Sequence, residues 1–186
     1  NNNMAKKLQS EIDGFLKEGR NVIEVFLIEE VIINNNEEEI RDTLTNIGKN
    51  YSDFALVYFG NTEGEFFTYP YREYDDYDPR TRGWYKAAKQ SDQAIWTDTY
   101  RSASTNDLLI TVAKKVVDSS GNMVGVIAGD FYLEYISNLI NETKVGETGN
   151  AFLVNEEGNL LAHPEQQLLE ENFNINEAFD LNQVLA

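Results

Sequence analysis

The sequence predicts an α+β fold, in which a long N-terminal helix is followed by an antiparallel sheet of about five strands. Apolar residues recur at helical spacing along residues 4–33. From residue 53 the pattern changes to short aromatic and β-branched runs, which are typical of strands. Short, turn-rich connections at 103–107 and 118–122 join three of these runs, as in an antiparallel meander.

Two helices are expected before the sheet. The apolar stripe of the first, over residues 4–33, is made of residues spaced to share one helical face: Leu8, Ile12, Phe15, Val22, Phe26 and Ile33. The second begins within 34–50, where three glutamates in its first turn complement the positive end of the helix dipole. Together they form a predicted segment 1–50.

The strands follow in order. The runs FALVYFG (54–60) and GEFFTYP (64–70) are expected to form a hairpin around the turn NTEG (61–64). Three further strands are predicted at 95–102, 108–117 and 123–132.

Helices and a second hairpin complete the predicted elements. The segment DPRTRGWYKAAKQ (78–90) begins like a helix, because Asp78 suits the N-cap and Pro79 suits the first helical position. Another helix is expected at 133–144, and a hairpin with a glycine turn at Gly158 is expected at 150–164.

Composition excludes several classes of function. The formal net charge is −17 and the pI is about 4.3. Nucleic acids and anionic lipid surfaces need a basic face, so neither is an expected partner. The chain has no cysteine and one histidine, His163, which excludes multi-histidine metal sites and histidine-based triads. No apolar run approaches the roughly 18–20 residues of a membrane span, so direct membrane insertion is not expected.

The stretch YPYREYDDYDPRTRGWY (69–85) is too polar for a core and too aromatic for an ordinary loop. It holds five tyrosines, one tryptophan, three arginines and four carboxylates. If one helix begins at Pro79, Arg82 and Tyr85 lie three residues apart on one face. A guanidinium beside aromatic hydroxyls suits a carboxylate, because it offers a planar, two-pronged set of donors.

Two strands are expected to supply the opposite wall of this site. Alternation along 95–102 places a row of side chains on one side: Trp96, Asp98, Tyr100 and Ser102. Asp130 lies near the end of the strand 123–132. An arginine on one wall with aspartate and tyrosine on another is the charge arrangement that an α-amino acid requires.

The element order resembles a PAS-like sensor lobe, and several segments in order resemble the double Cache family of extracytoplasmic sensor domains from prokaryotic chemoreceptors and sensor histidine kinases. These segments are DPRTRGWYKAA, WTDTY, LLITVAKKVVDSSGNMVGVIAGDFYLEYISNLI and KVGETGNAFLVNEEGNLLAHP. The resemblance implies a membrane-distal, PAS-like ligand-binding lobe at 51–144. It also implies the start of a membrane-proximal lobe at 145–186, with further strands beyond residue 186.

The resemblance also implies which residues bind. Amino-acid-sensing members of the family use a tyrosine, arginine, tryptophan–tyrosine, tyrosine and aspartate series, which falls here on Tyr77, Arg82, Trp84, Tyr85, Tyr100 and Asp130. Ser102 stands where those members usually carry an aspartate, which weakens the expected ammonium site. Asp98, on the same expected face, is a candidate substitute. The expected ligand-binding set is therefore Tyr77, Arg82, Trp84, Tyr85, Asp98, Tyr100, Ser102 and Asp130.

The interpretation is a sensor module rather than an enzyme, with a small carboxylate-bearing ligand, an amino acid first, and no cofactor or metal. In a full receptor, the long N-terminal helix would form a homodimer and carry the signal as the ligand shifts a two-state balance.

Other readings stay open. The ligand can be a simple organic acid or an amine. Arg82 can be a structural ion pair with Asp78, and Trp84 and Tyr85 can be plain core aromatics. The acidic residues Glu73, Asp75 and Asp76 can suggest a two-carboxylate hydrolase or a calcium site. A ligand-free dimerisation scaffold is a further alternative.

Overall fold

The computed structural model describes residues 2–25, 36–102, 108–133, 137–138, 140, 152–154, 158–163, 167–168 and 174–178. The chain divides into two compact units, one made of 1–14, 98–108 and 133–186 and the other of 15–97 and 109–132. Within the described ranges, no helix is long and apolar enough to cross a membrane.

The second unit contains helix α3 and most of an antiparallel sheet, together with the later part of helix α1 (Asn2–Val25). Helix α3 (Glu37–Asn50) begins where predicted, because the side chain of Asn36 accepts hydrogen bonds from the backbone N–H groups of Glu38 and Glu39. Its buried residues recur every three or four positions, as in an amphipathic helix: Ile40, Thr43, Leu44 and Ile47. The rest of the helix expected to reach residue 33 lies outside the described residues.

Six strands form the main sheet among the described residues, and five of them follow the order β2-β1-β6-β5-β3. Their bounds are β1 (Leu56–Asn61), β2 (Phe66–Tyr69), β3 (Ile95–Trp96), β5 (Leu108–Val117) and β6 (Met123–Tyr132), and the sixth is β4 (Tyr100–Arg101). All the pairings along that order are antiparallel, which confirms the predicted α+β class with a sheet of about five strands.

Both predicted turns between long strands are built by a side chain that bonds the following backbone. Asn61 Oδ1 accepts the N–H groups of Glu63 and Glu65 between β1 and β2. Asp118 Oδ1 accepts those of Ser120 and Asn122 between β5 and β6. These are the local bonds that favour asparagine and aspartate in turns.

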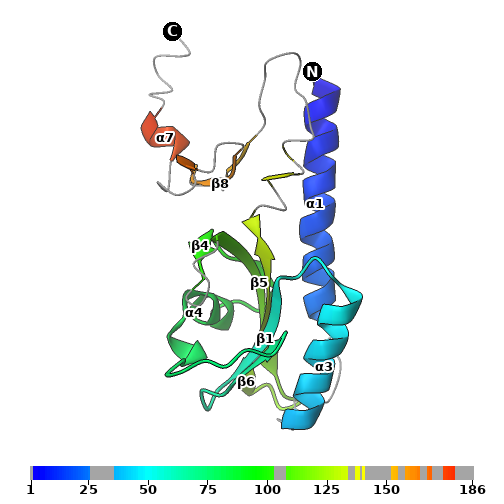
Figure 1. Ribbon diagram of the computed structural model, residues 1–186, viewed down its shortest axis with the longest axis vertical. Coiled ribbons are helices and arrows are strands. Elements are labelled where there is room, and N and C mark those ends of the chain that lie inside the picture. The colour runs from blue at the N-terminus through cyan, green and yellow to red at the C-terminus, as the bar shows by residue number, and fades with distance from the viewer. Residues whose placement is uncertain are drawn as a thin grey trace. The chain divides into compact units, whose positions relative to one another are not determined.

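Helices cover the two faces of the sheet in the second unit. Helices α1 and α3 lie on one face and helix α4 (Gly83–Lys89) on the other (Figure 1). Because side chains alternate along a strand, neighbours on β6 point to opposite layers. Asp130 faces the α4 layer and is bonded to Tyr58, while Phe131 packs against Phe15 of α1.

Two local predictions were wrong. The segment after Asp78 is not one helix, because a 3₁₀ turn, η2 (Pro79–Thr81), is closed by the Arg82 N–H on the Pro79 carbonyl. Arg82 itself is extended, with φ −81° and ψ 151°, and α4 starts at Gly83. Arg82 and Tyr85 therefore do not share a helical face.

The strand predicted at 95–102 is also interrupted, and it is found as β3 and β4. The Thr97 side-chain oxygen, rather than a backbone carbonyl, accepts the N–H of Thr111 at 3.2 Å. A side chain that replaces the backbone in this way ends the regular ladder. The strict alternation that placed Trp96 with Asp98, Tyr100 and Ser102 therefore does not hold.

The first unit contains the predicted second hairpin. Strands β7 (Leu153–Val154) and β8 (Leu160–Ala162) pair antiparallel, and Gly158 between them has φ +85°. Leu133, at the start of the helix predicted at 133–144, and Leu160 belong to one buried cluster. Much of that helix lies outside the described residues, and helix α7 (Ile175–Ala178) follows the hairpin. The predicted division into 1–50, 51–144 and 145–186 stays a prediction.

We expect Gly125→Ala to lower the free energy of unfolding by about 1–3 kcal/mol, the usual cost of overpacking. A Cβ at Gly125 would lie under 3.0 Å from the Gly60 carbonyl oxygen and the Phe59 ring. The control is Gly14→Ala in α1, where nothing lies within 4 Å, and this change should add up to about 1 kcal/mol through helix propensity. Urea denaturation measures both, and equal shifts in the two variants would contradict this account of the sheet.

Candidate ligand-binding site

Asp130 is the buried acid at the centre of the sheet. Strand register places it directly opposite Leu56 of β1 and Thr111 of β5, and Tyr58 follows Leu56 on the same face of β1. The residue is 5% exposed. Its Oδ1 accepts hydrogen bonds from the hydroxyls of Tyr58 and Thr111, each at 2.6 Å.

Arg82 approaches the same layer from the start of α4. Its extended backbone directs the guanidinium over the ring of Tyr77, with 4.2 Å between Cζ and the ring centroid. This is a cation–π contact, which holds the planar guanidinium flat on the aromatic face. The Trp84 indole N–H donates to the Tyr77 hydroxyl at 3.4 Å.

Tyr77 links the arginine to the aspartate electrostatically. Burial raises the pKa of the Tyr77 phenol above its usual value, the Trp84 bond and the Arg82 guanidinium lower it, and Asp130 raises it. The net direction is upward, so the hydroxyl keeps its proton at neutral pH and remains a donor. Both charged groups of the predicted site therefore lie within electrostatic reach of one phenol.

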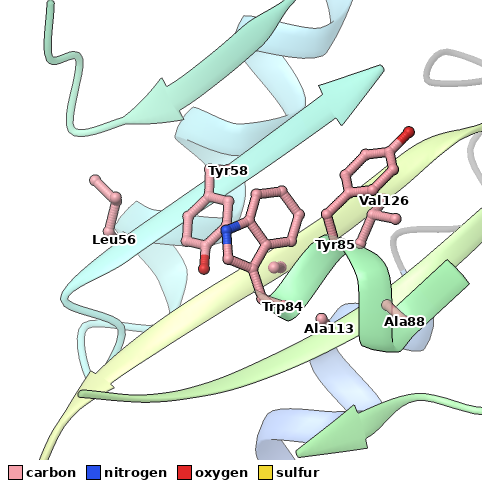
Figure 2. Close-up of a cluster of buried hydrophobic side chains, with 8 residues drawn as sticks. Leu56, Tyr58, Trp84, Tyr85, Ala88, Ala113 and Val126 are labelled. Carbon is pink, nitrogen blue, oxygen red and sulfur yellow. The ribbon is translucent and has the colours of Figure 1, made fainter. Parts of the chain in front are cut away.

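Aromatic rings connect these groups into one layer, which we call the aromatic cluster: Tyr58, Phe66, Tyr74, Tyr77 and Trp84. Tyr58 packs edge-on against Trp84 at 4.9 Å between ring centroids, and Phe66 stacks on Tyr77 at 4.4 Å. Figure 2 shows Tyr58 and Trp84 in contact between the sheet and α4. Aromatic faces of this kind suit both an apolar group and an ammonium.

Arg82 is half-buried, and one of its side-chain donors has no partner among the described residues. Its Nε is buried and has no hydrogen-bond acceptor among the residues that the structure describes. The ion pair considered with Asp78 does not form, because Asp78 is bonded by Arg80 at 2.8 Å. A buried donor on a cation normally has an acceptor, because leaving it unbonded costs free energy.

Tyr85 occupies a different position from the other predicted site residues. Its hydroxyl donates to the Asn61 carbonyl oxygen at 3.3 Å, and burial raises its pKa. Figure 2 shows the hydroxyls of Tyr85 and Tyr58 pointing in different directions. Tyr85 also lines an open hollow that includes Arg80, Lys86 and other residues of that region. The Tyr85 ring packs against the Trp84 ring, so Tyr85 contacts the aromatic cluster without belonging to it.

Three predicted residues belong to the other compact unit: Asp98, Tyr100 and Ser102. Asp98 is exposed, whereas Tyr100 and Ser102 are half-buried. Their participation in the site stays a prediction. The structure thus brings together Tyr77, Arg82, Trp84 and Asp130.

Sequence reasoning missed two residues of this site, Tyr58 and Thr111. Both lie in strongly apolar strands, FALVYFG and LLITVAKKVV, which predict core and nothing more. A signal was available, because a tyrosine within an otherwise apolar strand usually needs a hydrogen-bond partner for its hydroxyl. Which residue accepts that hydrogen bond depends on the pairing register of the strands, which the sequence pattern does not predict.

The acidic residues behind the hydrolase and calcium readings lie outside this cluster. Glu73, Asp75 and Asp76 are all exposed. Across the parts of the chain that the structure describes, no group of three or more histidine, cysteine, aspartate or glutamate residues could hold a metal ion.

Known proteins are similar to this chain in sequence and in fold. The chemotaxis receptor PscA of Pseudomonas syringae pv. tomato is 43% identical over 134 residues, which are 71% of this chain and 21% of that protein. The ligand-binding domain of the Pseudomonas fluorescens chemoreceptor CtaA, solved with L-serine, has a TM-score of 0.85 and 30% identity. That comparison covers 96% of this chain and 76% of the other.

The corresponding domain of Pseudomonas aeruginosa PctB, solved with L-Gln, has a TM-score of 0.81 and 28% identity over 92% of this chain and 70% of that domain. This chain spans about a fifth of the length of the curated relatives that it matches. The Cache domain model (dCache_1) matches residues 1–184. The chain belongs to the Cache domain family.

Proposed function

We propose that this chain is the extracytoplasmic ligand-binding domain of a transmembrane chemotaxis receptor, and that it binds an amino acid at the aromatic cluster. The observation that carries the proposal is the buried Arg82 Nε, which has no acceptor among the described residues while its guanidinium is stacked on Tyr77. The similarity to CtaA solved with L-serine and to PctB solved with L-Gln supports an amino acid as the ligand.

The ligand carboxylate would be held by Arg82. A guanidinium and a carboxylate match as two parallel charge-assisted bonds, and Nε is one of the donors that can take part. Tyr77 is a second donor nearby, since its hydroxyl keeps its proton. The ring contact with Tyr77 fixes the guanidinium plane before the ligand arrives.

The ligand ammonium would be held by Asp130 and the aromatic faces. Asp130 is the buried acid of the described cluster, and Trp84 and Tyr58 present rings beside it. Asp98, Tyr100 and Ser102 belong to the other unit, and their role as ligand residues stays a prediction. Ser102 offers a hydroxyl where amino-acid-sensing members carry an acid, so binding is expected to be weaker than in those members.

A simple organic acid or amine is the alternative ligand, and a hydrolase or a ligand-free scaffold is the alternative function. The relatives are chemotaxis receptors, which disfavours the hydrolase. An unsatisfied Arg82 disfavours the scaffold, because a purely structural arginine would normally be paired.

A thermal-shift panel tests this function. It contains the 20 L-amino acids and amine-free acids of matching size, each added to the isolated domain. A ligand present at 100 times its Kd adds about 2.7 kcal/mol to folding, which raises the Tm of a domain this size by about 5–10 °C. We expect one or more amino acids to do so. No shift with any amino acid would contradict the proposal, and shifts with amine-free acids alone would favour the organic-acid alternative.

Transmission would pass from Asp130 to helix α1 through its neighbour on β6. Phe131 points to the opposite face and packs at 4.8 Å on the ring of Phe15 and at 5.5 Å on that of Trp96. Gly19 lets α1 approach closely, since a Cβ there would lie 3.1 Å from Trp96 and 3.2 Å from Phe131. A small shift of β6 on ligand binding would therefore reach α1 directly, and α1 would carry it as the dimerising output helix of the full receptor.

The chain has two tryptophans, and each can report on a different face of the main sheet. Trp84 lies in the aromatic cluster, and Trp96 lies in the contact with α1. In ¹⁵N-labelled protein we expect both indole N–H signals to move when the best amino acid from the panel saturates the domain, with Trp96→Phe assigning the peaks. If only the Trp84 signal moves, the proposed route through Phe131 is wrong.

A further inference from the structure

Asp130 receives two hydrogen bonds on the same oxygen. The Tyr58 hydroxyl and the Thr111 hydroxyl each donate to Oδ1 at 2.6 Å, from β1 on one side and β5 on the other. All three side chains are buried, with exposed fractions of 5% or less. Distances of about 2.5–2.7 Å are those of a hydroxyl bonded to an ionised carboxylate.

These bonds favour the charged form of the acid. Each of the two hydroxyls has a single proton, and each donates it to the Asp130 carboxylate. A carboxylate accepts hydrogen bonds best when it is ionised. Burial alone works in the opposite direction, because removing a charge from water is costly. Among the described residues, Tyr77 interacts electrostatically with both Asp130 and Arg82.

We propose that Tyr58 and Thr111 are positioning residues that hold Asp130 as a fixed anion, and that they thereby make the site select ligands with an ammonium group over amine-free acids of the same size. The inference rests on the proposed amino-acid function and assigns the amine selectivity within it. Neither residue needs to touch the ligand for this role.

The selectivity depends on the contact with Asp130 that an amine-free ligand cannot make. Such a ligand can still bond Arg82 through its carboxylate, but it offers no partner to the buried Asp130 anion. Sites built to bond a polar group can discriminate against an analogue that lacks it by about 10⁴–10⁵-fold. If Asp130 loses its two hydroxyl donors, it can take up a proton or turn away, and that discrimination should fall.

A purely structural role predicts something different. The hydroxyls also tie β1, β5 and β6 together, so their loss will lower stability in any case. If they act only as structural links, affinity for both ligand classes should change together, and the ratio between them should stay constant. The ratio therefore separates the two roles, whereas affinity alone does not.

The test measures that ratio by calorimetry. The ligand pairs are L-alanine with propionate and L-serine with 3-hydroxypropionate, and the variants are Tyr58→Phe, Thr111→Val and the double variant. We expect the preference for the amino acid to fall at least tenfold in each single variant and further in the double variant. Thr111→Ser, which keeps the hydroxyl, should restore it.

A matched control is available on the same sheet. Thr68 is buried, and its hydroxyl bonds the Pro70 carbonyl and the Arg72 N–H instead of Asp130. Thr68→Val should leave the preference unchanged. An unchanged preference in Tyr58→Phe and Thr111→Val, in protein that still melts cooperatively, overturns the proposal.

A ligand-free measurement separates this inference from the proposed function. The Asp130 carboxyl carbon is titrated by ¹³C NMR in the wild type and in Tyr58→Phe/Thr111→Val. Loss of two donors to the charged form should move the Asp130 titration to higher pH, by at least tenfold in proton affinity. The same titration in both proteins overturns the inference even if amino acids bind. A wild type that binds none of the 20 L-amino acids, with the shifted titration present, contradicts the proposed function instead.

Discussion

Replacing Arg82 by alanine is expected to remove measurable amino-acid binding. Two charge-assisted bonds to the ligand carboxylate would be lost, each contributing about 1.5–3 kcal/mol, so affinity should fall by two to four orders of magnitude. Arg82→Lys should fail as well, because a single ammonium cannot reproduce the planar two-pronged contact. Isothermal titration calorimetry with the best amino acid from the panel measures both variants.

Arg80 is the matched control for this prediction. It is the neighbouring arginine, it lies on the surface, and it is already bonded to Asp78. Arg80→Ala makes the same change in charge, and we expect amino-acid affinity to change little. Undiminished affinity in Arg82→Ala would remove this residue from the site, and equal losses in both variants would point to a general electrostatic effect.

Replacing Asp130 by asparagine is expected to weaken amino acids far more than amine-free acids. Asparagine keeps an oxygen that can accept from Tyr58 and Thr111, so the sheet should remain folded. The negative charge that would hold the ammonium is lost, and hydrogen bonds to charged groups are worth about 1.5–3 kcal/mol each. Calorimetry with L-alanine and propionate separates the two ligand classes.

Asp118→Asn is the control for charge. Asp118 lies in the exposed turn between β5 and β6, where asparagine can also accept the turn bonds, and the net charge changes by the same amount. We expect no change in the preference for amino acids. If Asp130→Asn affects L-alanine and propionate alike, the ammonium assignment is wrong.

Much of the fold could be predicted because its signals are local. Alternating runs predicted the long strands, and the turns at Asn61 and Asp118 follow from side chains that bond backbone two to four residues ahead. The helix boundary after Asp78 could not be predicted in the same way. Its N-cap signal was correct, but a 3₁₀ turn has the same start as an α-helix, and the stacking of Arg82 on Tyr77 is a side-chain contact that helical periodicity does not describe.

The candidate site was predictable in its residue types and not in its geometry. Helix spacing, strand position and the family resemblance predict Arg82 and Asp130 as the charged pair. The bonds from Tyr58 and Thr111 depend on the register of β1 and β5 against β6, and register is set by packing across the whole sheet. The interruption of the strand after Trp96 depends on one hydrogen bond, which the Thr97 hydroxyl oxygen accepts from the Thr111 N–H. The spacing of apolar residues does not predict such a bond.

The structure of the domain with its best amino acid from the panel tests the central claim most directly. We predict that the ligand carboxylate lies within about 2.7–3.2 Å of the Arg82 guanidinium nitrogens, and that the ligand ammonium lies at the same distance from the Asp130 carboxylate. The aromatic faces of Tyr77 and Trp84 should line the space between. An amino acid bound elsewhere, for example in the hollow beside Lys86 and Lys89, or bound with its ammonium away from Asp130, would contradict the account.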